Sequence, residues 1–348
     1  MSGGRWAPEE PAGSRNTALK TIAWIDAPSP RGTWGHPNDL AIPLADRGLL
    51  LGDGLFETIL IEGGRPRLLG LHLKRWQASA ALLGMAPPPG MELVERLIEE
   101  AMVRSGLGHA RSGLDEALSG LGKARGSDGV ERCGALRLNW SRGIPTTRGI
   151  DLSLAPEPPP AHRFWLQLSP CQPAFTPVTT IHSRHERRNA HSRLSRCKTF
   201  AYGPSIQARR EARAAGADDA LLLSTTGELC CGTTANLLLK RGDRWLTPPL
   251  SSGCLPGVMR GRALELGLAV EAHLGLDDLD ASDAAVLINS LGCRPVVRCD
   301  QTNLVTTERV VPALAGPTPA GLTPAGPTLA EQLWRLIQEQ QDIGPHPQ

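Results

Sequence analysis

The sequence predicts an α+β protein with two unequal domains and an active site in the cleft between them. The chain has 348 residues, enough for two domains of about 100–200 residues each. Strand-like and helix-like segments are mixed, without a βαβ unit repeated throughout. A proline-rich stretch at 154–162 interrupts this pattern and is typical of an interdomain linker, because proline fixes φ and removes a backbone donor.

Composition excludes several classes of protein. The hydrophobic content of 41% supports true cores, and the net charge of +2 provides no global basic field for nucleic acid. No apolar run is long enough to span a membrane, and the N-terminus has no signal-peptide core. The eight cysteines form no C-x-x-C pair, which indicates reduced thiols and a cytoplasmic protein. No metal site is expected, with zinc kept as the minor alternative.

The first half is expected to hold the smaller α/β domain, at 21–153, after a disordered leader at 1–20. An insertion rich in Gly, Ser and Ala is expected at about 105–130. The elements expected are a strand at Leu55–Ile61, a turn at 63–64, a helix at Leu71–Leu83 ending at Gly84, a helix from Met91 to Met102, and a strand at Ala135–Trp140.

The second half is expected to hold the larger domain, at 163–311, followed at 312–348 by a proline-rich tail with a short helix at Leu329–Gln340. The elements expected are strands at Phe164–Leu168, Ala220–Leu223, Ala235–Lys240 and Ala285–Ile288, with a helix from Pro204 to Ala215 capped by Gly216.

Lys198 ends a basic run, His182–Lys198, which holds five Arg, three His and one acid. A positive field lowers the pKa of a lysine amine and attracts anions, so the run can activate Lys198 as a nucleophile. From the run alone, a solvated loop or a nucleic-acid patch is favoured. The histidines with Cys197 are a weak candidate for a metal site.

Two further segments could bind a phosphate. Leu255–Arg260 precedes a helix, and backbone N–H groups at a helix start can bind anions. Arg75 follows His72 within a predicted helix and could bind a phosphate, although a surface charge is the commoner explanation. Neither segment is specific by itself, and no nucleotide-binding motif is present.

These pieces occur together in an order that resembles the fold-type IV pyridoxal phosphate enzymes. The matching segments are Asp46–Gly48, Gly52–Thr58, His72–Arg75, Lys198 with Glu211, Gly227–Asn236, Thr247-Pro248 and Leu255–Arg260. The resemblance covers about residues 38–300. The family contains branched-chain and D-amino acid aminotransferases and aminodeoxychorismate lyase, so the D-amino acid aminotransferase-like fold is implied.

The resemblance also implies roles for individual residues. Lys198 would carry pyridoxal 5'-phosphate as a Schiff base and act as general base, with Tyr202 near it. Arg75 and the backbone amides of Val258 and Met259 would hold the cofactor phosphate. Ser290 stands where the aminotransferases have a threonine facing that phosphate. Family members are dimers, which implies a homodimer.

Two segments resemble the lyase branch of the family, Asn289–Leu291 followed by Arg294–Val296, and Asn139–Gly143. In the second segment, Arg142 could meet a substrate carboxylate. One position departs from the family pattern: Cys231 stands where a glutamate faces the pyridine nitrogen. A carboxylate keeps that nitrogen protonated, whereas a thiol does so less well. Elimination that produces an aromatic ring needs this less than transamination does.

The sequence therefore predicts a pyridoxal phosphate-dependent lyase that converts 4-amino-4-deoxychorismate to 4-aminobenzoate and pyruvate, in folate biosynthesis. Its substrate would be a small molecule, with no nucleic-acid or membrane partner. A class IV aminotransferase acting on branched-chain or D-amino acids is the first alternative. A catalytically weak homologue that only binds the cofactor is the second, and Cys231 keeps it open.

Overall fold

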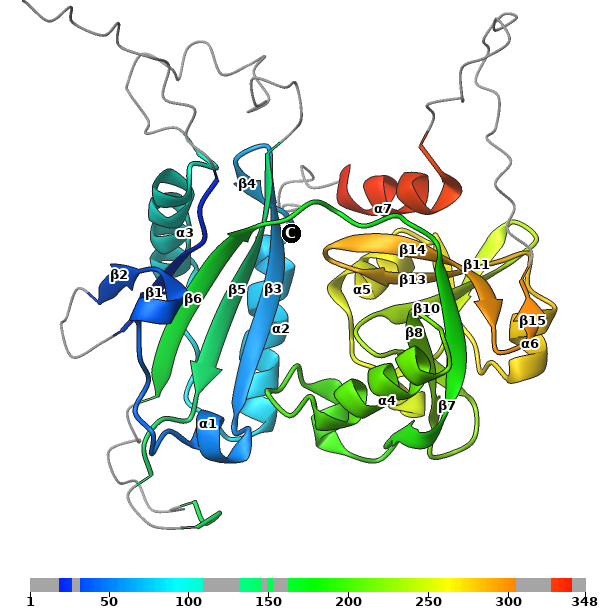
Figure 1. The fold of residues 1–348 in the computed structure, drawn as a ribbon, viewed down its shortest axis with the longest axis horizontal. Helices are drawn as coiled ribbons and strands as arrows, with labels where there is room; N and C mark the ends of the chain where they lie inside the picture. Colours follow the sequence, from blue (N-terminus) through cyan, green and yellow to red (C-terminus); the bar gives the residue numbers. More distant parts are fainter. Residues whose placement is uncertain are drawn as a thin grey trace, which may run out of the picture.

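The computed structural model describes residues 19–26, 32–108, 132–145, 149–152, 162–304 and 327–339. It contains two lobes, each built on one sheet (Figure 1). Most of the expected leader at 1–20, most of the expected linker at 154–162, most of the insertion at about 105–130 and the proline-rich part of the tail lie outside the described residues. Within these residues, no helix is both long and apolar enough to cross a bilayer.

The first lobe holds a six-stranded sheet with two helices packed on one face. The strands lie in the order β2 (Thr33–Gly35), β1 (Ile22–Ile25), β6 (Arg163–Pro170), β5 (Cys133–Ser141), β3 (Gly54–Glu62) and β4 (Arg65–Pro66). The helices are α2 (Leu69–Leu82) and α3 (Met91–Ser105), with the short α1 (Arg47–Leu51) and the 3-10 turn η1 (Pro37–Asp39) at the edge.

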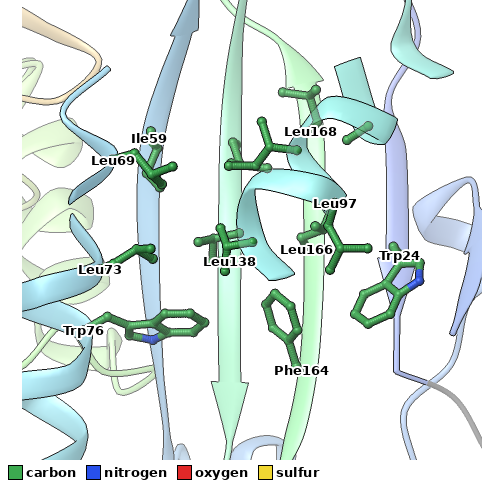
Figure 2. Close-up of a cluster of buried hydrophobic side chains, with 14 of the residues drawn as sticks. Trp24, Ile59, Leu69, Leu73, Trp76, Leu97, Leu138, Phe164, Leu166 and Leu168 are labelled. Atoms are coloured by element: carbon green, nitrogen blue, oxygen red, sulfur yellow. The ribbon is translucent and has the colours of Figure 1, made fainter. Parts of the chain in front are cut away.

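The core of this lobe lies between the sheet and these two helices. Trp76 of α2 packs with Ile59 of β3 and Leu138 of β5, all less than 2% exposed (Figure 2). Because side chains alternate along a strand, Ile59 and Ile61 enter this core while Leu60 faces the second lobe. Both faces of β3 are therefore buried, which explains its nearly continuous apolar sequence.

The second lobe holds a nine-stranded sheet that closes on itself. The strands lie in the order β12 (Ala269–Glu271), β11 (Arg244–Thr247), β10 (Asn236–Arg241), β13 (Ala284–Asn289), β14 (Gly292–Cys299), β7 (Val178–Arg188), β8 (Asp219–Ser224) and β9 (Leu229–Gly232), with β15 (Thr302–Asn303) on β14. A bridge between Asn236 of β10 and Cys231 of β9 closes the ring.

The remaining elements surround this ring. They are α4 (Gly203–Ala214), α5 (Val258–Glu265), α6 (Leu276–Asp280), α7 (Leu329–Glu339) and the 3-10 turns η2 (Arg193–Arg196) and η3 (Leu250–Ser252). In Figure 1, α7 lies above β13 and β14 on the side that faces the first lobe. A buried cluster that includes Leu60, Met259 and Trp334 joins the two lobes.

The expected strands and helices named above all occur, with small differences at their ends. The position expected for the linker is wrong. β6 begins at Arg163, directly after the proline-rich stretch, and pairs with both β5 and β1 of the first sheet. The chain therefore crosses to the second sheet between Pro170 and Val178. Proline marks where an element ends, but it does not determine which sheet the next strand joins.

The basic run is the second difference. From the run alone a solvated loop or a nucleic-acid patch was favoured, but its first part belongs to β7, which extends through Arg188 and lies between β14 and β8. Its pairing with β8 is irregular between His182 and Arg187, and it resumes at Arg187 and Arg188. The chain leaves the sheet after Arg188 and continues to the segment that holds Lys198.

Candidate active site

A cavity of about 530 Å³ lies between the two lobes, and Lys198 lines it. The first lobe contributes Phe56 and Thr58 of β3, Arg75 of α2 and Arg137 of β5. Polar residues that the second lobe contributes include Arg187, Arg188, Asn189, Tyr202, Cys231, Asn236, Asn289 and Ser290. This volume is in the range typical of small-molecule sites.

The backbone around Lys198 is joined to β3. The Phe56 amide donates to the Lys198 carbonyl at 2.9 Å, and the Phe200 amide donates to the Gly54 carbonyl at 3.0 Å. A Cβ on Gly54 would lie 2.2 Å from the Phe200 ring, so only glycine allows this approach. The segment that carries Lys198 is thus fixed against the first lobe.

The Lys198 side chain lies between two aromatic groups. Its Nζ donates to Tyr202 Oη at 3.1 Å and lies 4.3 Å from the centroid of the Phe56 ring. Tyr202 and Phe56 themselves pack with centroids 5.4 Å apart. These contacts hold the amine in one orientation at the cavity wall. Its hydrogen-bond partner is the Tyr202 hydroxyl and not a carboxylate.

Arg75 is held by a buried carboxylate that the sequence alone did not single out. Glu57 accepts from Arg75 Nε at 2.8 Å and from Arg75 NH2 at 2.5 Å, and it accepts from His72 Nδ1 at 2.7 Å. Burial opposes ionisation of Glu57, but the Arg75 charge and the His72 hydrogen bond outweigh it and hold the pKa at about 2. Glu57 is thus a carboxylate at neutral pH.

His72 continues this network across the cavity. Burial lowers its pKa, so the ring is neutral near pH 7. With the proton on Nδ1 shared with Glu57, Nε2 accepts from the Ser290 hydroxyl at 3.2 Å. A hydroxyl has one proton to donate, so Ser290 can serve a phosphate only by releasing His72.

The start of α5 forms a second polar wall. Val258 and Met259 line the cavity and begin α5. The backbone amides of a helix's first turn have no hydrogen-bond partner inside the helix, so they are available to a ligand. Arg75 NH1 donates to the Pro256 carbonyl at 3.1 Å, which places the guanidinium beside this turn. A Cβ on Gly257 would lie 1.9 Å from Asn236 Oδ1, so the tight turn requires glycine.

Cys231 lines the cavity from β9 and is 7% exposed. Its neighbour Cys230 is fully buried, and a hydrogen bond with Cys231, a second with Cys254 and burial raise the pKa of Cys230, which stays a thiol. Among the described residues, the lining of the cavity contains no Asp or Glu side chain, whereas it contains Arg75, Arg137, Arg187, Arg188 and Lys198. The cavity is therefore cationic and suits an anionic ligand.

Arg142 is placed elsewhere. Its Nε donates to Asp53 at 2.8 Å, and NH1 and NH2 donate to the carbonyls of Gly84 and Leu83 at 2.9 Å. It is 6% exposed and is not among the residues that line the cavity. It joins the end of β5 to the end of α2, so the expectation that it meets a substrate is corrected.

Arg137 is the cavity arginine that sequence reasoning missed. It lies opposite Thr58 in the pairing of β5 with β3, and its guanidinium lies 3.6 Å from the centroid of the Phe56 ring. Its Nε donates to Asn139 at 2.7 Å. The available signal was strand alternation, because Arg137 is on the opposite face from the buried Leu136 and Leu138.

The fold and the cavity define an enzyme that binds a small anionic cofactor at a lysine between two lobes. The chain belongs to the class IV aminotransferase family, whose model matches residues 54–299. The fold is the fold-type IV arrangement of these enzymes, as expected from the sequence.

The similar proteins are named for two different activities, a lyase and an aminotransferase. The chain is 23% identical over 282 residues to aminodeoxychorismate lyase of Bacillus subtilis, covering 78% of this chain and 86% of the relative. It is 23% identical over 298 residues to a branched-chain-amino-acid aminotransferase-like protein of Arabidopsis thaliana, covering 81% of this chain but spanning only 46% of that longer protein.

Solved structures agree in fold. A structure from Legionella pneumophila, provisionally named 4-amino-4-deoxychorismate lyase, matches with a TM-score of 0.63 and 26% identity over 76% of this chain and 89% of that one. A hypothetical aminotransferase of Mycobacterium tuberculosis in its pyridoxal phosphate-bound form matches with a TM-score of 0.64 and 22% identity, over 91% and 97% of the two chains.

The family depends on pyridoxal 5'-phosphate, and this is the cofactor of the chain. The cavity fits it. A lysine amine is available for its aldehyde, and its phosphate suits the start of α5 beside Arg75. Three recorded hydrogen bonds use three of the five Arg75 N–H groups, which leaves two for a ligand.

Proposed function

We propose that this protein is a pyridoxal phosphate-dependent aminodeoxychorismate lyase, which converts 4-amino-4-deoxychorismate to 4-aminobenzoate and pyruvate. The observation that carries the proposal is the cationic lining of the cavity, which is free of Asp and Glu among the described residues and includes both Lys198 and Cys231. The substrate carries two carboxylates, so such a lining favours it. Folate biosynthesis, a cytoplasmic location and a homodimer belong to the same proposal.

In this proposal, Arg75 and the amides of Val258 and Met259 hold the cofactor phosphate, with Ser290 as a further donor once it releases His72. Helix-start amides and a guanidinium are strong partners for a phosphate. Glu57 fixes the orientation of Arg75, because Nε and NH2 of the guanidinium both donate to this buried carboxylate, and the two N–H groups that make none of the recorded hydrogen bonds are left for the phosphate.

Lys198 is the proposed catalytic residue. When bound, pyridoxal phosphate supplies an electron sink for the carbon next to the substrate nitrogen. Lys198 Nζ would take the proton from C4 of the substrate ring while the bond between C3 and the enolpyruvyl oxygen breaks, which makes the ring aromatic. The enolpyruvate that leaves would take up that proton at its methylene carbon and become pyruvate. Tyr202 Oη orients Nζ for this step, since it is the recorded hydrogen-bond partner of the amine.

Cys231 favours elimination over transamination. Transamination needs a ring nitrogen that stays protonated, which a carboxylate ensures. Cys231 offers a thiol, and the buried carboxylate of Glu57 is occupied by Arg75 and His72. Aromatisation of the product provides driving force that transamination lacks, so the lyase tolerates a weaker sink.

Arg137 is proposed to bind a substrate carboxylate in place of Arg142. It lies on the cavity face of β5, and its fixed position on the Phe56 ring orients the guanidinium. We expect Arg137→Gln to raise KM for aminodeoxychorismate about tenfold or more, as the loss of a charge-assisted hydrogen bond does, without abolishing the cofactor absorbance band. Arg244→Gln, at an exposed position on β11, is the matched control. An unchanged KM in Arg137→Gln would remove this assignment.

The decisive experiment combines absorbance with product detection. The purified protein with pyridoxal phosphate should show the visible band of a lysine-bound cofactor and should release pyruvate from aminodeoxychorismate. Lys198→Ala should lose both, whereas Lys74→Ala, an exposed lysine on α2, should lose neither. A band without pyruvate that is bleached by branched-chain or D-amino acids would establish the aminotransferase instead. A band with neither activity would indicate the weak homologue.

A further inference from the structure

The turn between β13 and β14, Asn289–Leu291, forms one wall of the cavity. It is held from several directions. The Ser290 hydroxyl meets His72 of the first lobe, and the Leu291 carbonyl accepts from the Ala174 amide at 2.9 Å. The position of this wall therefore depends on contacts from outside its own hairpin.

Trp334 of α7 makes one of these contacts. Its indole Nε1 donates to the Asn289 carbonyl at 2.9 Å, and its side chain is fully buried. The ring also packs edge-to-face against Phe175, with centroids 5.2 Å apart. Because the indole has one donor and two flat apolar faces, this geometry fixes both the ring and the carbonyl.

The next residue on α7 reaches the other lobe. Arg335 forms an ion pair with Glu62, which is 2% exposed and also binds Arg67 at 3.0 Å. Glu62 ends β3, the strand that carries Phe56 and Thr58 on the opposite wall of the cavity. Adjacent residues of α7 thus contact the turn that forms one wall and the end of the strand that carries the other wall.

We propose that α7 is a clamp that sets the distance between the two walls of the cavity, with Trp334 as a positioning residue. Trp334 does not line the cavity; it acts through the Asn289 carbonyl. Arg335 supplies the tie to the first lobe. The inference rests on the proposed function only in that the cofactor and the substrate occupy this cavity.

Trp334→Phe tests the clamp, because it keeps an aromatic ring and removes the N–H. The matched control is Trp245→Phe, a buried tryptophan of the same cluster on β11, which is separated from β13 by β10. Both variants lose the same volume. We expect Trp334→Phe to weaken the binding of pyridoxal phosphate to the apoprotein about tenfold and to raise KM while kcat changes less than threefold. Trp245→Phe should leave both constants unchanged.

Equal loss of thermal stability in both variants, with cofactor affinity unchanged in Trp334→Phe, would overturn the clamp and leave α7 a purely structural helix. Should Trp334→Phe not fold, Arg335→Gln replaces it, since that side chain is 35% exposed. Arg335→Gln should weaken cofactor binding, and Arg335→Lys, which retains the charge opposite Glu62, should restore it. An affinity unaffected by Arg335→Gln would also overturn the proposal.

Cofactor affinity can be measured without any turnover, so this test separates the clamp from the lyase. A protein that binds pyridoxal phosphate more weakly when Trp334 is changed, but that releases no pyruvate, supports the clamp while removing the proposed reaction. Pyruvate release with unchanged affinity in every α7 variant supports the reaction while removing the clamp.

Discussion

The buried carboxylate of Glu57 gives the sharpest quantitative prediction. Glu57 is 1% exposed and binds both Arg75 and His72. Glu57→Gln keeps the shape of the side chain and removes the charge. The amide also presents N–H groups to partners that are themselves donors, so at least one of the recorded hydrogen bonds is lost. We expect this variant to fold less stably and to bind cofactor more weakly.

The magnitude follows from the pKa of Glu57, which is about 2 rather than the ordinary 4.5. At about 1.4 kcal/mol per pH unit, this difference corresponds to about 3 kcal/mol of folding free energy. Because the pKa is lower in the folded state, the contribution is present above pH 4.5 and is lost as pH falls toward 2. Removing one member of a buried ion pair costs a similar amount, about 3–5 kcal/mol.

Urea unfolding at several pH values measures this contribution. At pH 7, Glu57→Gln should reduce the free energy of unfolding by about 3 kcal/mol or more. At pH 3, the difference from wild type should be smaller by about 2 kcal/mol, since the wild-type carboxylate is then losing its advantage. Glu99→Gln, exposed on α3, is the control and should change little. A difference below 1 kcal/mol at pH 7, or one that is constant with pH, would refute the reasoning.

Three other variants test the cavity. Gly257→Ala places a Cβ against Asn236 Oδ1, so pyridoxal phosphate titration should give at least tenfold weaker binding; unaltered binding would contradict the phosphate site. Cys231→Glu should raise the rate of half-transamination with D- or L-alanine relative to pyruvate release, and a constant ratio would show that position 231 does not select the reaction. The kcat/KM for aminodeoxychorismate should fall with ionic strength, and less steeply in Arg187→Gln, whereas equal slopes would argue against steering by this exposed cation.

Local signals in the sequence predicted most single elements. Gly84 and Gly216 have φ values of 61° and 70°, which fits their expected places after α2 and α4. The strand expected at Leu55–Ile61 extends one residue further at each end, and the helix expected to follow Arg260 begins three residues earlier, at Val258. These features depend on hydrophobic periodicity and backbone sterics over a few residues, which the sequence contains directly.

Contacts between distant segments could not be predicted in this way. Strand pairing placed β6 in the first sheet, although the preceding prolines favoured a domain boundary there. Strand pairing also determines that Arg137, and not Arg142, enters the cavity. Arg137 lies opposite Thr58, whereas Arg142 lies beyond the end of the strand and turns toward Gly84 and Leu83. A shift of one residue reverses the face of every side chain, so register has to be known first.

The role of Cys231 also depends on contacts between distant segments, which the sequence does not give. In the sequence, a thiol at the family's glutamate position could indicate a changed reaction or a damaged site. A damaged site would be expected to have lost other parts, such as the glycine turn at Gly257 or the carboxylate that holds Arg75. Both are intact, and the described lining holds five cations and no acid. Anion-binding groups that are kept while the carboxylate is missing support the proposed elimination, which does not need that carboxylate.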